Sequence, residues 1–497
     1  MFPVYIALPG EPLRLKTPAA YFALPVLLSL ALGACTTVGP DYKKPPTEAP
    51  AEWNSLNQTM PPATNTGATG DLSQWWQTLN DPLLTQLMEE ALQANLDLRS
   101  AQARLREARS RRTATASFKY PDVNASINAN RNRFSKEAGS GTTVNLYSAG
   151  FDASWELDVF GGVRRSVEAA DADVQSSQAS LDATQVSLVA EVASSYIEVR
   201  AQQSLLAISR SNVESQSETL QLTDWRAQAG LVSVQDVEQA RSNRDQTRAQ
   251  IPSIETSLAE AEHSLDILLG RPPGTLHQRL ATTTALPNVP VQIAVGIPAE
   301  TLRQRPDVHA AERKLAAETA RVGVAEAARY PNFTLTGSIG LEALTLGSLG
   351  SADATRSSLG AGVTAPIFNA GRLRALVDVQ DAVREQALVS YEQTVLSALQ
   401  EVENALVNFS RNRERGEALM SAVKSARTAA VLARERYSAG LIDFQSVLTS
   451  ERTVLVLEES LARNQADGVL ALIRLYKALG GGWSPEGNPA TASKEAP

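Results

Sequence analysis

The sequence contains almost no cysteine or histidine. Its 497 residues include one cysteine and three histidines. A single cysteine cannot form a disulfide within the chain, so stability must come from packing and assembly. His263, His277 and His309 lie in three separate segments without the spacing of metal ligands, and we find no nucleotide-binding loop or nucleophile elbow. We therefore expect no catalytic residue, no metal, no cofactor and no enzymatic activity.

The chain also lacks an excess of positive charge. Its beginning contains one long apolar run. The formal net charge is −8 at pH 7, which argues against a nucleic-acid partner. The apolar run, Ala19 to Leu32, follows Arg14 and Lys16 and is shorter than the roughly 20 residues that a membrane-spanning helix needs. This arrangement predicts a cleaved signal peptide over residues 1–34.

Cys35 stands directly after this leader. Residues 32–35, Leu-Gly-Ala-Cys, resemble the lipobox of bacterial lipoproteins, whose cysteine receives a diacylglycerol and becomes the first residue of the mature chain. A lone cysteine more often fills a core, but its position at the end of a leader favours lipidation. Thr36 stands where an aspartate would favour retention in the inner membrane. We therefore expect a covalent lipid on Cys35 and delivery to the bacterial outer membrane.

The sequence repeats itself once. Residues 95–121 resemble residues 305–331, and residues 228–237 resemble residues 438–447, both at an offset of 210 residues. Solenoid repeats usually have periods of 20 to 50 residues, so a single long duplication indicates two similar halves rather than a stack.

Apolar and polar side chains alternate in four segments, at residues 122–129, 147–159, 332–339 and 359–367. A period of two with one apolar and one polar face indicates a strand between an apolar medium and a wet interior. Four half-buried strands of a soluble sheet would alternate in the same way. In a lipoprotein, however, strands of about 10 residues fit tilted membrane crossings around a water-filled lumen.

Four strands are too few to form a membrane barrel alone. The smallest bacterial barrels have about 8 strands, and open strand edges in lipid would leave backbone groups without partners. Two copies of the chain would give a lumen largely filled by side chains, whereas three copies would leave room for a passage. We therefore expect a trimer.

The remaining sequence indicates long helices. Residues 163–229 and 372–439 are helical runs with few glycines or prolines, each roughly 100 Å long at 1.5 Å per residue. Gly230 and Gly440 end them and predict helix-turn-helix tips, followed by shorter return helices such as residues 231–269. An ordinary coiled-coil scaffold would show the same apolar spacing. The predicted order in each half is a helix (95–119 or 305–329), two strands, a long helix, a tip and a return helix.

Several short motifs resemble one family, the TolC-like outer-membrane factors, and most closely its lipidated NodT/OprM-type efflux branch. The similarity covers most of the mature chain. The motifs are Gly39-Pro40-Asp41-Tyr42, Trp75-Trp76, Arg305-Pro306-Asp307-Val308, the Tyr-Pro pairs at 120–121 and 330–331, and residues 475–483 (Leu-Tyr-Lys-Ala-Leu-Gly-Gly-Gly-Trp).

This resemblance implies a mainly α fold with membrane β structure. Each chain would supply four transmembrane strands to the twelve-stranded barrel of a homotrimer, and its helical hairpins would form a periplasmic tunnel. The expected divisions are a signal peptide (1–34), a lipidated N-terminal segment of the equatorial region (35–80), a first repeat (81–270), an equatorial linker (271–298), a second repeat (299–482) and a disordered tail (483–497).

The resemblance also implies roles for the tips. Gly230-Leu231 and Gly440-Leu441 match the turns that contact a periplasmic adaptor, although the leucines could instead cap the local coiled coil. Two gate aspartates of the family correspond to Ser446 and Thr449 here. Asp443, nearer the tip, and with less weight Asp236 are the replacement gate candidates, and an exposed solubilising role fits both equally well.

We therefore expect a passive outer-membrane duct for small molecules. Its implied partners are two further copies of the chain, a periplasmic adaptor (membrane fusion protein), an inner-membrane pump of the RND type and outer-membrane lipid. A duct for type I protein secretion and a non-conducting envelope scaffold lipoprotein are the alternatives. No residue pattern identifies the cargo.

Overall fold

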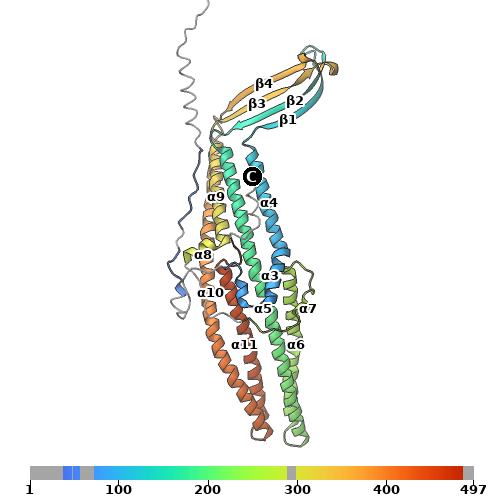
Figure 1. The fold of residues 1–497 in the computed structure, drawn as a ribbon, viewed down its shortest axis with the longest axis vertical. Helices are drawn as coiled ribbons and strands as arrows, with labels where there is room; N and C mark the ends of the chain where they lie inside the picture. Colours follow the sequence, from blue (N-terminus) through green and yellow to red (C-terminus); the bar gives the residue numbers. More distant parts are fainter. Residues whose placement is uncertain (1–36, 47–48, 56–71, 288–297, 485–497) are drawn as a thin grey trace, which may run out of the picture. The chain divides into compact units, whose positions relative to one another are not determined.

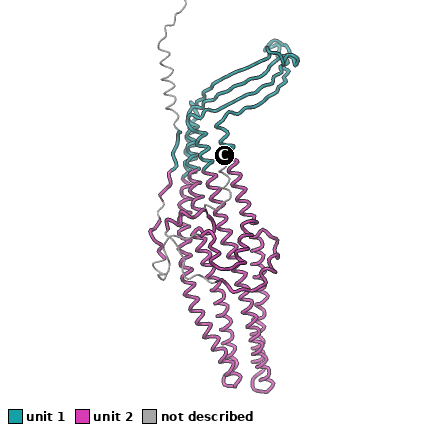
Figure 2. The backbone as a smooth tube through the Cα atoms, in the orientation of Figure 1, with its two compact units in different colours: residues 1–42, 111–171, 317–384 teal, residues 43–110, 172–316, 385–497 magenta. Residues whose placement is uncertain are grey.

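A computed structural model describes residues 37–46, 49–55, 72–287 and 298–484. The predicted signal peptide, the candidate lipidation site Cys35 and the predicted tail from residue 485 lie outside these residues. The chain divides into two compact units, shown in Figure 2. Unit 1 comprises residues 1–42, 111–171 and 317–384, and unit 2 comprises residues 43–110, 172–316 and 385–497.

Unit 1 contains an antiparallel sheet with the strand order β1-β2-β3-β4. Both edge strands, β1 and β4, have one neighbour each within the described part of the chain. The sheet therefore presents two unpaired edges. The strands are β1 (Asp122–Arg133), β2 (Thr143–Leu157), β3 (Asn332–Ala343) and β4 (Thr355–Thr364).

One face of this sheet is apolar and exposed. The register places Phe151 opposite Ile339, and Gly337 opposite Leu359. The side chains of Phe151, Ile339 and Leu359 are 58%, 61% and 82% exposed. Strand side chains alternate between faces, so these apolar groups share one surface that nothing in the described chain covers.

The opposite face is polar. Asp152 pairs in register with Asn124 and Ser338, and Ser338 pairs with Ser358. The hydroxyl of Ser126 donates to Asp152 at 3.1 Å, and the hydroxyls of Ser338 and Ser358 lie 2.7 Å apart. The sheet thus has an apolar face and a hydrogen-bonding face, as the alternation predicted.

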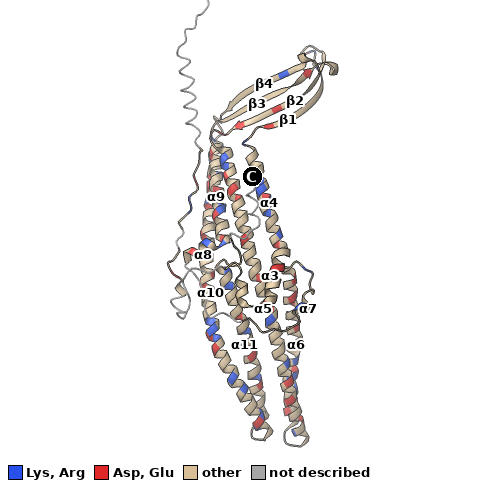
Figure 3. Ribbon diagram, in the orientation of Figure 1, with Lys and Arg blue, Asp and Glu red and all other residues tan. Residues whose placement is uncertain are grey.

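Helices make up most of the remaining structure (Figure 1). The charged residues concentrate on them, and Figure 3 shows few on the sheet. None of the helices in the described ranges combines the length and the apolar character needed to cross a membrane. The elements are η1 (Trp75–Leu79), α3 (Pro82–Ala94), α4 (Leu96–Ser117), α5 (Gly162–Gln228), α6 (Val234–Leu268), α7 (His277–Leu280), α8 (Pro298–Gln304), α9 (Pro306–Ala327), η2 (Leu346–Ser348), η3 (Ala352–Ala354), α10 (Arg372–Ser438) and α11 (Phe444–Ala478).

The internal duplication is confirmed in three pairs of helices and in one pair of strands. The pairs α4/α9, α5/α10 and α6/α11 have equal lengths of 22, 67 and 35 residues. Their first residues differ by 210 positions in each pair, as do those of β1 and β3. The two halves therefore build the same backbone parts in the same order.

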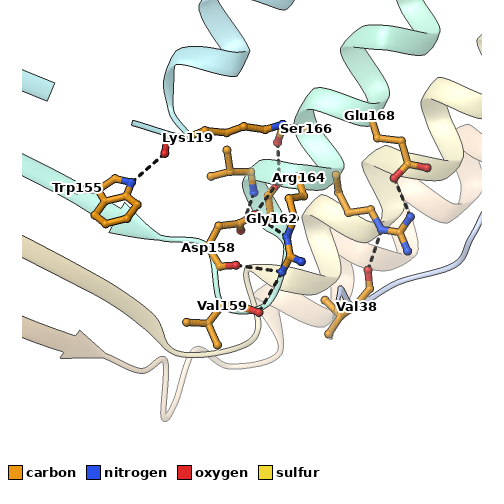
Figure 4. A network of polar contacts seen from close by, with 11 residues as sticks. Val38, Lys119, Trp155, Asp158, Val159, Gly162, Arg164, Ser166 and Glu168 are labelled. Carbon is orange, nitrogen blue, oxygen red and sulfur yellow. Dashed lines mark hydrogen bonds and ion pairs between the residues drawn. The ribbon is translucent and has the colours of Figure 1, made fainter. Parts of the chain in front are cut away.

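Some predicted boundaries were wrong. Strand β2 ends at Leu157, and β4 spans 355–364 rather than 359–367. Asp158 leaves the strand because its carboxylate accepts hydrogen bonds from the backbone N–H groups of Val163 and Arg164, at 2.9 and 2.8 Å, and so caps α5. Figure 4 shows this cap.

The helix predicted at 95–119 is preceded by a separate helix, α3, which ends before Asn95. The amide nitrogen of Asn95 donates to the carbonyl of Leu268 at 2.9 Å, and its amide oxygen accepts from the N–H of Leu98. Arg305 occupies the equivalent place in the second half and donates to the carbonyl of Ala478 at 3.0 Å. Each junction residue thus ties the start of a helix to the end of a return helix.

The main hydrophobic core lies in unit 2 and contains the aromatic motif residues. Trp75 and Trp76 are 2% and 5% exposed. Trp75 stacks on Tyr476 with ring centroids 5.1 Å apart. Large aromatic side chains bury much apolar area, so Trp75 packs the short helix η1 against α11.

Candidate functional site

The two helix-turn-helix tips contain the predicted tip and gate residues. The tip glycines, Gly230 and Gly440, have φ values of 70° and 75°. At each turn the residue after the glycine donates its N–H to a carbonyl five residues earlier, Leu231 to Arg226 at 2.8 Å and Leu441 to Arg436 at 2.9 Å. This is a Schellman motif, which satisfies the last helix carbonyls and requires a left-handed residue. The glycines are therefore turn-forming residues.

The two leucines beside these glycines point away from the bundle. Leu231 is 67% exposed and Leu441 is 73% exposed. The next residues, Val232 and Ile442, are partly buried and pack against the cluster beneath the turns. In the described chain, Val232 and Ile442 therefore cap the local apolar core, and the leucines remain free to contact another molecule.

The candidate gate aspartates cap the helices that follow the turns. Ser233 and Asp236 form a capping box at the start of α6. Asp443 caps α11, and its carboxylate accepts from the N–H of Ser446 at 3.0 Å and from its hydroxyl at 2.7 Å. The hydroxyl of Ser446 lowers the pKa of Asp443. Serine and aspartate thus exchange places between the halves, and both carboxylates have a structural role.

An apolar cluster beneath the turns joins the two hairpins in unit 2, where α5 and α6 lie side by side, as do α10 and α11 (Figure 1). Tyr437 is 1% exposed, and its ring lies 5.7 Å from that of Phe444. Arg226 packs over the Tyr437 ring at 4.5 Å and donates to the Tyr437 carbonyl. The buried members are Leu220, Val237, Ala240, Ala433, Tyr437, Phe444, Val447 and Leu448.

A buried carboxyl group lies farther from the turns. Glu451 is 5% exposed, and the hydroxyl of Thr219 donates to it at 2.5 Å. Arg434 approaches the same carboxylate to 3.7 Å. Burial raises the pKa of Glu451 above its ordinary value, and the contacts with Thr219 and Arg434 offset only part of that effect. The interior between the hairpins is therefore partly polar.

Sequence reasoning located the turns but missed the residues that join the hairpins. Arg226, Tyr437 and Glu451 gave no motif signal, because an arginine, a tyrosine and a glutamate are ordinary in a polar helix. A comparison of the halves would have singled out Tyr437, since Ala227 stands at the equivalent position. No cluster of three or more histidine, cysteine or acidic side chains suited to a metal ion occurs in the parts of the chain that the structure describes.

Comparison with known proteins identifies the architecture. The model of the family described as "Outer membrane efflux protein" matches residues 87–271 and again residues 297–481. The chain belongs to the outer membrane efflux protein family. The double match of the family follows the duplication seen in the helices and strands.

Full-length relatives agree with this assignment. Nodulation protein T of Rhizobium leguminosarum bv. trifolii is 33% identical over 92% of this chain and 96% of its own length. The pyoverdine export outer membrane protein OpmQ of Pseudomonas putida is 33% identical over 92% of this chain and 97% of its own length. The outer-membrane channel OprN has the same fold, with a TM-score of 0.86 and 36% identity over 90% of this chain and 100% of that chain. This efflux family member is therefore an outer-membrane channel protein.

Proposed function

We propose that three copies of this efflux protein close a twelve-stranded barrel and extend it as a helical tunnel into the periplasm. The observation that carries the proposal is the four-stranded sheet, which has two unpaired edges and an exposed apolar face. Strand edges are satisfied in lipid only by closure, and an apolar face is stable against acyl chains. Twelve strands leave a lumen, which the polar face would line.

The assembly is testable by mass. Detergent-extracted protein is expected to run as a single trimeric species by light scattering or native mass spectrometry. A monodisperse monomer that retains its strands would contradict the barrel.

The proposed channel acts as a passive duct for small molecules. It would receive its cargo from a periplasmic adaptor and an RND-type inner-membrane pump, without catalysis of its own. The names of relatives support a small-molecule cargo, since they include pyoverdine export and toluene efflux proteins. A wide duct selects cargo poorly, so the pump would determine the substrates.

Cargo class can be tested in the source bacterium. Deletion of the gene is expected to raise the intracellular accumulation of a fluorescent dye that the pump exports, and complementation is expected to reverse it. Unchanged dye accumulation together with loss of a secreted protein would replace this proposal by type I secretion. The absence of any transport defect would instead support a non-conducting envelope scaffold.

At the tips, Gly230-Leu231 and Gly440-Leu441 are proposed to contact an adaptor hairpin. Leu231→Asp combined with Leu441→Asp is expected to leave trimer yield and helicity nearly unchanged, because both side chains are exposed. It is expected to abolish crosslinking to the adaptor and dye export. Ile442→Asp is the matched contrast and should destabilise the hairpins. Full export by the double variant would refute the docking role.

Asp443 and Asp236 are further proposed to form part of the periplasmic gate. Their capping role complicates an alanine test, but asparagine keeps an oxygen acceptor at the N-cap position of Asp443 and at the N3 position of Asp236 and removes only the charge. Asp443→Asn and Asp236→Asn are therefore expected to raise the leak conductance of trimers in planar bilayers without loss of thermal stability. Unchanged conductance in both variants would show that the two residues act only as helix caps.

Lipidation of Cys35 is the remaining part of the proposed function. Cys35→Ser is expected to abolish acylation and cleavage at that position, as measured by mass spectrometry of the purified chain. An unmutated protein whose mature N-terminus carries no lipid would contradict it.

A further inference from the structure

Two arginines are the only charged strand residues on the apolar face of the sheet in unit 1. Arg131 and Arg133 lie in β1, opposite Asn145 and Thr143 of β2. They share the face of Ile127, because residues an even number of positions apart along a strand point to the same side. The other charged residues of the four strands lie on the polar face: Asp122, Asp152, Glu156, Glu342 and Arg356.

Both arginines lie at the end of the sheet that is remote from the helices. Strand β1 follows α4 and β2 precedes α5, and β3 and β4 are joined to α9 and α10 at the same end (Figure 1). The connections 134–142 and 344–354 therefore form the opposite end, and Arg133 is the last residue of β1. In the proposed channel the helices extend into the periplasm, so the end with the arginines faces the exterior.

The alternation of apolar and polar residues reverses at the level of these arginines. On the helix side of this level, Ala129 pairs with Tyr147 on the apolar face. Beyond Tyr147, β2 places the polar Asn145 on that face and the apolar Leu146 on the other face. A surface in contact with hydrocarbon stays apolar and is bordered by aromatic side chains. The change beside Tyr147 therefore marks the outer limit of the hydrocarbon layer in the proposed barrel.

The distance of the arginines beyond this limit matches the layer of lipid headgroups. Arg131 and Arg133 lie two and four residues after Ala129, which is about 7 and 14 Å along a strand. A strand tilt of about 40° reduces these distances to about 5 and 10 Å along the membrane normal. Headgroups occupy about 5 to 8 Å on each side of the hydrocarbon core. The arginine pair therefore spans the outer headgroup layer.

The charges of these two arginines are not neutralised within the described ranges of the chain. Both residues are exposed, and neither guanidinium has a hydrogen bond or an ion pair there. By contrast, Arg356 on the polar face pairs with Glu342 at 2.6 Å. A guanidinium binds phosphate oxygens through two parallel hydrogen bonds, and anionic headgroups attract arginines that lie near the membrane surface. Arg131 and Arg133 therefore fit a phosphate group at this depth.

We propose that Arg131 and Arg133 bind the phosphate group of a lipid headgroup in the outer leaflet of the outer membrane. The inference rests on the proposed barrel, because the arginines contact lipid only if the apolar face of the sheet is the outer face. A lipid fits this site better than free phosphate does, since the exposed apolar side chains of the same face, such as Ile127, would contact its acyl chains. A trimer would carry the site three times, once on each β1 strand.

The test measures the binding of lipid A, a phosphorylated glycolipid, to trimers in phosphatidylcholine nanodiscs, with adducts counted by native mass spectrometry. Arg131→Gln and Arg133→Gln are each expected to raise the half-saturating fraction of lipid A by about fivefold, and by about 25-fold together, from the loss of charge beside an anionic surface. Arg356→Gln removes an arginine from the polar face and is the matched control, which is expected to leave binding unchanged. Equal binding by the double variant and the unmutated trimer would overturn the proposal.

Measurements on the unmutated protein keep the test independent of how the variants fold. Dephosphorylated lipid A is expected to bind the unmutated trimer no better than lipid A binds the double variant, and equal binding of the two lipids would contradict a phosphate site. Inorganic phosphate, added to nanodiscs without lipid A, is expected to form no stable adduct, and an adduct as stable as that of lipid A would show an anion site without lipid preference.

Two further outcomes separate this inference from the barrel on which it rests. If the double variant loses the trimer in detergent without lipid A, the arginines belong to a contact between copies and the lipid site is refuted. If the unmutated chain forms no trimer in detergent, the barrel itself is refuted. A stable trimer of the double variant that has lost lipid A binding is the result that we expect.

Discussion

The two halves of this efflux protein make the same contacts with different side chains. At the start of α4, Asn95 reaches the carbonyl of Leu268, and at the start of α9, Arg305 reaches the equivalent carbonyl of Ala478. The target in both cases is a backbone oxygen, whose position follows from the helix geometry. A duplicated fold can therefore keep its geometry while the donor changes from an amide to a guanidinium.

The halves diverge more strongly where side chains meet side chains. Phe444 is 3% exposed beneath the second tip, while Val234, its equivalent in the first, is 72% exposed. Tyr437 likewise replaces Ala227. The second hairpin therefore contributes the larger share of the apolar core between the hairpins. Because the two halves share a backbone but differ in packing, substitutions at equivalent positions are expected to change the free energy of unfolding by different amounts.

The largest expected loss of stability lies at the junctions. Arg305 is 7% exposed and makes a bidentate pair with Asp307. Burial would raise the pKa of Asp307, but Arg305 outweighs it and lowers that pKa. Removing the arginine leaves the Ala478 carbonyl without this donor and leaves Asp307, whose side chain is 41% exposed, with backbone donors only, so Arg305→Met is expected to cost about 3 kcal/mol, near the upper end for lost hydrogen bonds to a charged group.

The matched change in the first half is Asn95→Ala, which removes a helix cap and one buried hydrogen bond and is expected to cost about 2 kcal/mol. Thermal denaturation of detergent-solubilised trimers measures both. The Arg305 pair also has a pH signature: because the pKa of Asp307 is lowered, its stabilisation is present above pH 3.8 and is lost as the pH falls further. A larger loss for Asn95→Ala than for Arg305→Met would reverse the comparison.

A smaller loss of stability is expected beneath the tips. Phe444→Val gives the second half the residue of the first and removes buried ring atoms, at a cost of about 2 kcal/mol. The reciprocal Val234→Phe changes an exposed side chain and is expected to stay within about 0.5 kcal/mol. Native-state hydrogen exchange measures the effect of Phe444→Val in α11 and that of Val234→Phe in α6. Equal effects would show that Val234 is covered in the assembled protein.

The buried Glu451 predicts a pH dependence of stability that the first half does not share at the equivalent position. Its equivalent in the first half is Arg241, which is half exposed. Because burial raises the pKa of Glu451, folding favours its protonated form; this stabilisation is complete below the ordinary pKa of 4.5 and is lost as the pH rises through the folded-state pKa. Glu451→Gln is expected to raise the melting temperature modestly at pH 7 and to flatten its pH dependence. An unchanged pH profile would mean that Glu451 is ionised throughout.

The sequence predicted most of the architecture because its patterns are long. The alternation of apolar and polar residues located the four strands, and the offset of 210 residues identified the equivalent helices of the two halves. The sequence did not locate the contacts of Asn95 and Arg305 with carbonyl oxygens, because these contacts depend on positions that only the folded backbone sets. The gate candidates Asp236 and Asp443 were found as acidic residues near a turn, but their capping hydrogen bonds depend on local φ and ψ.

The smallest expected effect concerns these caps. The first tip has serine at the N-cap and aspartate three residues later, whereas the second has Asp443 followed by Ser446. Both orders place a side-chain oxygen on the same N–H group. Exchanging the pair in the first tip, with Ser233→Asp and Asp236→Ser, should therefore leave the exchange rate of the residue 236 amide unchanged. Asp443→Ala removes the acceptor and should speed the exchange of the Ser446 amide, while Asp443→Asn should not. The alternative outcome is that the Ser233→Asp, Asp236→Ser variant speeds amide exchange at residue 236 as much as Asp443→Ala speeds it at Ser446. The two turns would then not be interchangeable, and the order of serine and aspartate would reflect a partner at the tip rather than the helix itself.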